Sequence, residues 1–211
     1  RTNGVWSEQQ KLRASDGASD DQFGYSVSID GDTAVIGARG DDDNGSNSGS
    51  AYVYVRSNDV WTEQAKLTAS DGAPGDYFGN SVSIDGDTAV IGAYGDDDNG
   101  SNSGSAYVYV RSNGVWSEQQ KLTASDGASG DYFGISVSID GDTAVIGADQ
   151  DDDNASNSGS AYVYVRSNGV WSEQQKLTAS DGAESDQFGY SVSIDGDTAV
   201  IGARLDDDNG S

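Results

Sequence analysis

A near-identical segment recurs along this chain at a fixed interval of 55 residues. Its clearest markers are one tryptophan and one phenylalanine in each copy. These markers are Trp6, Trp61, Trp116, Trp171, Phe23, Phe78, Phe133 and Phe188. A period of this length is typical of repeat architectures, in which similar units stack into one body with a continuous core. We therefore expect a single repeat domain over residues 1–211, with units at 1–55, 56–110, 111–165 and 166–211.

Each unit predicts four short β-strands. The first, VWSEQQKL, has a face of mixed polarity, as expected of an outer, half-solvated strand. The second, FGxSVSID, alternates large apolar residues with small serines, which suits a strand packed tightly between neighbours. The third, TAVIGA, is apolar and β-branched enough to be buried on both faces, and the fourth, AYVYV, alternates tyrosine with small apolar residues. The first type is expected at Val5–Leu12, Val60–Leu67, Val115–Leu122 and Val170–Leu177, and the others, in the second unit, at Phe78–Asp85, Thr88–Ala93 and Ala106–Val110.

Two kinds of connection join these strands. Asp85-Gly86 and Asn113-Gly114 are short links of the type that favours tight β-hairpins. The other two connections, residues 68–79 and 92–106, are long and rich in Asp, Asn, Ser and Gly, which build turns. Alternate connections of an up-and-down meander lie on opposite faces. We therefore expect a plain face of tight turns and a strongly negative face of long loops.

Together these features predict an all-β fold without helices, namely a β-propeller of four-stranded antiparallel blades with four repeats in this chain. A β-solenoid and an open array of small sheets are the alternatives. The strand count is uneven, because the last unit ends before its AYVYV strand and the first VW strand therefore has no AYVYV partner. We expect another chain, or the rest of a longer polypeptide, to complete this blade, and self-association is one route.

The composition excludes several functional classes. The formal net charge is −25, with 36 acidic and 11 basic residues, so the chain repels phosphate backbones and attracts cations. Neither histidine nor cysteine occurs, which removes Ser-His-Asp, Cys-His and zinc chemistry. No apolar run approaches the ~20 residues of a membrane span. We expect no enzyme, no nucleic-acid partner and no membrane span.

The residues Phe78-Gly79, Ser81-Val82 and Ile91-Gly92-Ala93, repeated in all four units, resemble FG-GAP repeats of the bacterial type and, distantly, the integrin α-subunit propeller. The resemblance covers the whole chain. It implies a propeller, an extracellular or cell-surface setting in a bacterium, and a role in binding or adhesion rather than catalysis. Integrin-type repeats carry a DxDxDG calcium loop where this chain has only Ile84–Asp87. The family's metal site is therefore not expected at those positions.

Acidic clusters in the long loops are the main candidates for a metal site. Calcium prefers several carboxylate, carbonyl and water oxygens, and these loops offer all three. The alternative is a solvated turn in which Asp side chains cap backbone N–H groups. The candidate calcium ligands are Asp41, Asp42, Asp43, Asp96, Asp97, Asp98, Asp151, Asp152, Asp153, Asp206, Asp207, Asp208, Asp71, Asp76, Asp126 and Asp131.

A few loop positions differ between otherwise similar units. Tyr77 and Tyr132 are replaced by glutamine in the other two units, and we expect both tyrosines to contact a ligand, either a protein or a glycan. Arg39-Gly40-Asp41 is an RGD tripeptide without counterparts, which indicates drift at a variable position. The leading hypothesis is an extracellular binding or adhesion scaffold that acts through an acidic, calcium-binding loop face. The alternatives are a structural self-assembling segment and a carbohydrate-binding propeller.

Overall fold

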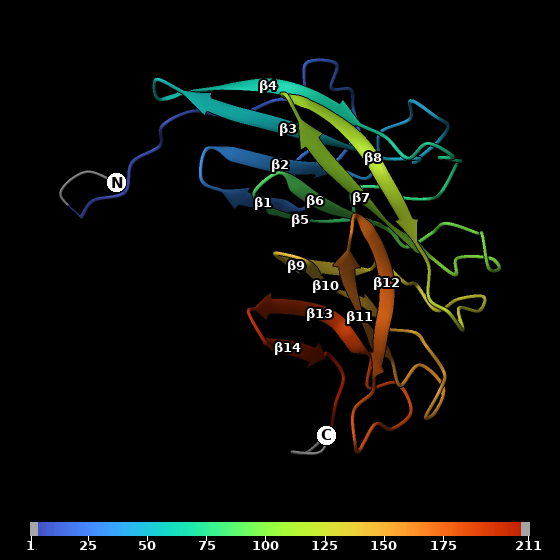
Figure 1. Ribbon diagram of the computed structural model, residues 1–211. Helices are drawn as coiled ribbons and strands as arrows, with labels where there is room; N and C mark the ends of the chain where they lie inside the picture. Colours follow the sequence, from blue (N-terminus) through green and yellow to red (C-terminus); the bar gives the residue numbers. More distant parts are fainter. Residues whose placement is uncertain (1–3, 208–211) are drawn as a thin grey trace.

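The computed structural model describes residues 4–207, and within this range every regular element is a β-strand (Figure 1). Three antiparallel sheets have four strands each, in the orders β1-β2-β3-β4, β5-β6-β7-β8 and β9-β10-β11-β12, and a fourth sheet pairs β13 with β14. We refer to these sheets as blades one to four. The predicted all-β fold with propeller blades is confirmed, and the outer strand of each four-stranded blade comes from the next repeat.

The strands follow the repeats closely. The inner strands are β1 (Val27–Asp30), β5 (Ser81–Asp85), β9 (Ser136–Asp140) and β13 (Phe188–Asp195). The second strands are β2 (Thr33–Ala38), β6 (Thr88–Ala93), β10 (Thr143–Ala148) and β14 (Thr198–Ala203). The third strands are β3 (Ser50–Ser57), β7 (Ser105–Ser112) and β11 (Ser160–Ser167). The outer strands are β4 (Val60–Leu67), β8 (Val115–Leu122) and β12 (Val170–Leu177).

The strand predicted at Val5–Leu12 is wrong, because only an isolated bridge at Val5 is present there. The physical reason is the missing partner. Each of β4, β8 and β12 pairs with the AYVYV-containing strand that precedes it, and residues 4–207 hold no such strand paired with Val5–Leu12. The segment is instead held by side chains, since Gln10 donates to the carbonyl of Trp61 and accepts its N–H.

The blades follow one another in chain order, and the long loops gather on one side of the body, the right of Figure 1. Contacts between connections confirm the two-faced arrangement that the meander predicts. Arg111, at the end of β7, pairs with Asp87 in the β5–β6 turn at 2.6 Å, so both tight turns lie together. At the opposite face, Lys121 near the end of β8 reaches both long acidic loops.

Neighbouring blades bury one another's faces. The valine face of blade one, formed by Val35, Ala51, Val53 and Leu67, shares a hydrophobic cluster with one face of blade two. We call this second surface the aromatic face. It includes Phe78, Val82, Ile84, Ile91, Tyr107, Tyr109 and Trp116. The same pairing recurs between blades two and three, so each complete interior sheet is apolar on both sides.

Hydrogen bonds between inner strands add a polar seam at the hub. Ser26, just before β1, and Ser28 of β1 accept the backbone N–H groups of Val82 and Ile84 on β5, at 3.1 and 3.2 Å. Asp30 extends the row by accepting the N–H of Gly86. These bonds explain the small serines opposite the large residues, because a longer side chain would separate the inner strands.

Close approach of the blades depends on glycine in the TAVIGA strand. A Cβ atom on Gly92 would overlap the carbonyl oxygen of Gly134 in the next blade, and backbone cannot move aside cheaply. Gly86, in the exposed turn, has a φ of +55° and open space around its would-be Cβ. The first glycine is therefore required by packing and the second only by backbone conformation.

We predict that Gly92→Ala lowers the free energy of unfolding by about 3 kcal/mol, because an added methyl group forces two blades apart. The matched variant Gly86→Ala should cost only about 1 kcal/mol, which is the strain of a left-handed alanine. Chemical denaturation followed by tryptophan fluorescence measures both. Equal losses in the two variants would contradict this account of the blade contact.

Candidate functional site

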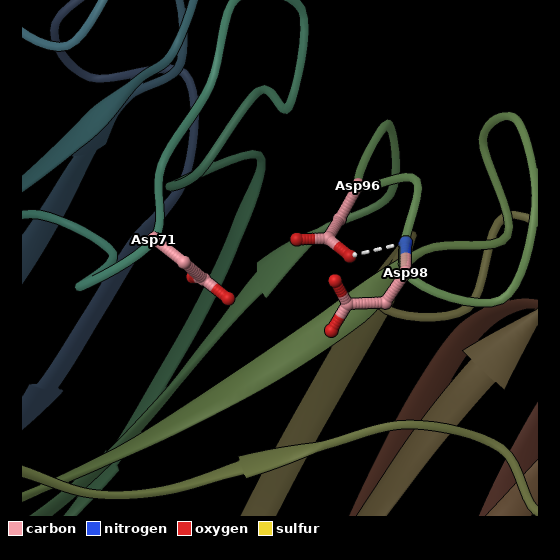
Figure 2. A group of neighbouring side chains, drawn as sticks. All are labelled: Asp71, Asp96 and Asp98. Carbon is pink, nitrogen blue, oxygen red and sulfur yellow. Dashed lines mark hydrogen bonds between the residues drawn. The ribbon is translucent and has the colours of Figure 1, made fainter.

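The acidic loops converge on one lysine in each blade. In blade two, one carboxylate oxygen each from Asp71, Asp96 and Asp98 lies within 4.8 Å of the others, and Figure 2 shows the three side chains gathered from two loops. The ammonium group of Lys121 lies 2.8 Å from both Asp71 and Asp96, and 2.6 Å from Asp98. We call this arrangement the lysine clamp. It joins the third and outer strands of a blade to the long loop that precedes the inner strand of that blade, residues 68–79 in blade two.

The clamp is repeated in the neighbouring blades. Lys66 and Lys176 each contact three aspartates in the same way. A tyrosine hydroxyl completes each cluster, and in blade two Tyr107 lies 2.8 Å from Asp71 and 2.9 Å from Asp96. The three clamps comprise Lys66, Lys121, Lys176, Tyr52, Tyr107, Tyr162, Asp16, Asp41, Asp43, Asp71, Asp96, Asp98, Asp126, Asp151 and Asp153.

Burial and pairing set the protonation states of the clamp. Burial acts to raise the pKa of Asp71, but hydrogen bonds from Lys121 and Tyr107 outweigh it and hold that pKa below its ordinary value. Burial likewise acts to lower the pKa of Lys121, and its bonds to Asp71, Asp96 and Asp98 raise it overall. Asp71 and Lys121 are therefore both charged at neutral pH. Asp76, just outside the clamp, behaves differently, because burial raises its pKa.

The remaining predicted metal ligands have different surroundings. Asp42, Asp97 and Asp152 each accept a backbone N–H five residues further on, at 2.7 Å. Asp76 and Asp131 accept the N–H of the residue three positions earlier, also at 2.7 Å. These five side chains act as turn caps, as the alternative interpretation describes. Asp206 and Asp207 follow the two-stranded blade four, and Asp208 lies outside the described residues.

Sequence reasoning missed the lysine of the clamp. Lys121 stands opposite Tyr107 in the pairing of β7 with β8, and this register places both side chains toward the same loop end of the blade. One sequence observation could have found it. A single lysine occupies the same position of every VWSEQQKL segment in a chain with few cations, namely Lys11, Lys66, Lys121 and Lys176.

The clamp bears directly on the fit of calcium. Its carboxylates are the hard oxygen donors that calcium requires, but the lysine ammonium already lies among them. A divalent ion at this point would have to displace a cation that makes three short ion pairs. Calcium binding by these aspartates therefore stays a prediction.

A second group of residues gathers at the hub, at the end nearer the long loops. Arg39 donates to Gln22 at 2.8 Å and to Asn80 at 3.1 Å, and its guanidinium lies 3.7 Å above the ring of Tyr25. All four residues occupy positions at which the repeats differ. Tyr25 and Asn80 also line a hollow of about 300 Å³ to which all four inner strands contribute.

The predicted ligand-contact residues belong to this group. Tyr77 stacks on Tyr94 with ring centroids 5.1 Å apart, and Tyr94 meets Tyr132 edge-on at 5.3 Å. Tyr77 and Tyr132 both have a left-handed backbone, with φ of 56° and 60°, which is unusual for a bulky residue. We call the variable residues at this end of the hub the hub patch. It comprises Gln22, Tyr25, Arg39, Tyr77, Asn80, Tyr94, Tyr132, Ile135, Asp149 and Tyr190.

The RGD tripeptide is not displayed as a recognition loop. Asp41 is only 4% exposed and belongs to the Lys66 clamp, while Arg39 is held within the hub patch. Gly40 packs so closely on the backbone of Asp20 that no side chain would fit there. The geometry agrees with drift at a variable position.

The fold and these two sites define a repeat protein of the propeller class, in which identical residues hold the blades together and variable residues meet at the hub. The sequence pattern of the FG-GAP repeat family matches residues 6–54, 61–109, 116–164 and 171–211, and the chain belongs to this family. No curated protein matches the chain. Among solved structures, the chain is similar to the computationally designed Ika4 protein, with 16% identity, a TM-score of 0.54 and 92% of each chain covered. That likeness supports the fold alone.

We predict that Lys121→Met lowers the free energy of unfolding by about 2–3 kcal/mol, because it leaves three carboxylates close together with no cation between them. The Lys121 side chain is only 16% exposed, so water screens these charges poorly. Lys11→Met is the matched control. Lys11 holds the equivalent sequence position but is exposed, and it makes no ion pair within residues 4–207.

Acid should reveal the same interaction. The pKa of Asp71 is below 3.8 in the folded protein, so its stabilising contribution is present above pH 3.8 and is lost as the pH falls through the folded pKa. Thermal unfolding midpoints should therefore drop more steeply in the unmodified protein than in Lys121→Met below about pH 4. Parallel pH profiles of the two proteins, or an equal loss in the Lys11→Met control, would contradict the clamp.

Proposed function

We propose that this chain is an extracellular protein-binding module whose partner docks on the hub patch. One observation carries the proposal: three of the repeat positions that differ, those of Tyr77, Asn80 and Tyr94, gather at one end of the hub. The residues common to all repeats hold neighbouring blades and loops together, and the scaffold gives no reason for Arg39, Tyr94 and Asp149 to occupy equivalent positions. Other differences between the repeats, such as Asp59, Ala65 and Ala155, occur singly in strands and loops away from the hub.

The chemistry of the hub patch favours a protein partner. Tyrosine and arginine dominate the energetic centres of protein interfaces, and both are concentrated here on a rigid scaffold. Tyr77 and Tyr132 occupy positions of left-handed backbone, where a bulky side chain costs about 1 kcal/mol or more. That cost supports a role for their rings beyond folding.

Charge narrows the type of partner. The surrounding loops are strongly acidic, and a chain with a net charge of −25 attracts basic surfaces over a long range. Asp149 lies at the hub patch with one carboxylate oxygen that no donor of the described chain satisfies, and burial raises its pKa. The acidic surroundings of the hub patch favour a partner that presents lysine or arginine.

The setting and the absence of catalysis are parts of the same proposal. Membership of the FG-GAP repeat family supports an extracellular or cell-surface location. Residues 4–207 contain no helix long and apolar enough to cross a membrane. The carboxylates that could perform acid–base chemistry are repeated identically in several blades and are engaged by lysine. An active site would instead require one blade to differ from the others.

Binding can be tested with arrays of basic peptides and of neutral glycans. We expect capture of basic peptides that weakens as salt rises, and a loss of affinity of at least tenfold in the double variant Tyr94→Ala/Tyr132→Ala. Val170→Ala, an exposed change at the opposite face, is the matched control and should leave binding unchanged. Capture that depends on glycans would favour the carbohydrate-binding alternative. Capture that survives the double variant would place the site elsewhere.

Calcium binding at the acidic clusters is the second candidate function, and the convergence of Asp71, Asp96 and Asp98 favours it. Millimolar calcium should then raise the thermal unfolding midpoint, and a chelator should lower it. Lys121→Gln should strengthen the response, because the competing ammonium group is gone while the oxygen donors remain. An unchanged midpoint in both proteins would eliminate this candidate.

A further inference from the structure

The inner part of the aromatic face of blade one is uncovered at the first end of the row of blades. Val27 and Ile29 of β1 are 66% and 63% exposed, whereas their counterparts in blades two and three are each 6% exposed. These counterparts are covered by the valine face of the preceding blade. This part of blade one is therefore a candidate docking surface for a valine face, because the aromatic faces of blades two and three each pack on a valine face.

The other end presents the complementary surface. Val200 of β14 is 68% exposed, although the equivalent valines of blades one to three are completely buried. Val35 and Val90 belong to the valine faces of blades one and two, and Val145 is buried at the same position of blade three. Blade four thus exposes the inner part of a valine face, and blade one exposes the inner part of the aromatic face that a valine face covers between neighbouring blades.

The hydrogen-bonding groups of the polar seam are also complementary: the first end presents N–H donors and the last end presents serine and aspartate acceptors. Between blades two and three, Ser81, Ser83 and Asp85 accept the N–H groups of Val137, Ile139 and Gly141. Between blades three and four, Ser138 and Asp140 accept in the same way, whereas Ser136 donates to the carbonyl of Gly189. At the first end, the corresponding N–H groups belong to Val27, Ile29 and Gly31. At the last end, the corresponding acceptors are Ser191 and Ser193, with Asp195 beside them.

The first end also marks where a further blade would lie. Leu12 and Ala14 pack on the outer part of the aromatic face of blade one, as Leu67 and Ala69 do in the next blade contact. Between this segment and β1 is a hollow of about 720 Å³, lined in part by Ile29. Within residues 4–207, this position has an outer segment but no inner strands, while blade four has its two inner strands but no third or outer strand.

We propose that two copies of this chain associate head to tail, with blade four of each copy docking on blade one of the other. The contact is heterologous, so it closes a ring only if the rotation from blade to blade fits. Two copies give eight blades, within the usual propeller range of about 4–8, whereas three copies would exceed it. The first and last blades lie at opposite ends of the fan, as half of a ring requires (Figure 1).

Sedimentation equilibrium of the unmodified chain should give twice the chain mass of 21.8 kDa. Val27→Asp and Val200→Asp should each remain monomeric at concentrations tenfold above those at which the unmodified chain is dimeric. Val115→Asp is the matched control. Val115 is also 68% exposed, but it lies at a hairpin tip away from both end faces. The Val115→Asp variant should therefore dimerise as the unmodified chain does.

Mixing the two variants tests the pairing itself. One intact contact can form between the blade four of Val27→Asp and the blade one of Val200→Asp, so differently tagged variants should associate when mixed but not alone. A like-with-like contact would leave one of the two single variants dimeric, and mixing would restore nothing. That result overturns the proposal, as does a mass of one chain at all concentrations or a mass that grows without limit.

Discussion

A sheet that is apolar on both faces is stable only between two other layers, and this constraint organises the whole chain. In the first three blades the TAVIGA strand is almost entirely buried. The valine face of one blade and the aromatic face of the next cover each other, and in blade one the segment with Leu12 and Ala14 covers the outer part of the aromatic face. Each buried tyrosine or phenylalanine contributes on the order of 2–3 kcal/mol. Radial stacking, tight glycine contacts and the serine seam all follow from bringing these faces together.

The same constraint separates the two kinds of site. Residues that pack between blades, or clamp a loop to a strand, recur in each complete blade because every blade meets the same kind of neighbour. Lys121 and Tyr107 are of this type, since they bind the loop that enters their blade. The hub patch lies where blades meet only at their inner edges. Its residues do not pack between blade faces, so they can differ from one repeat to the next. A site of low symmetry can therefore arise on a scaffold of high symmetry.

Much of the fold could be predicted from the sequence, because strand period, turn residues and repeat length are local properties. The clamp could not, because it depends on strand register. Each third strand pairs with its outer strand through a register shift. In blade two this shift lies between Val108 and Tyr109, and the resulting register sets Tyr107 opposite Lys121. The aspartates alone indicated a cation, and the structure supplies one from the protein itself. Val5–Leu12 was predicted as a strand for a similar reason, since its local pattern is correct but its partner is missing.

Near-identical blades specify how one blade meets the next but not how many blades meet. A contact within the chain and a contact between chains then have the same chemistry, and only geometry distinguishes them. The rotation between blades is set by side-chain volume at the faces and by the separation that the serine seam allows. A protein built this way controls its assembly through what covers its two end faces. Val27 and Val200, which are surface residues in one chain, are core residues in any closed ring of these blades.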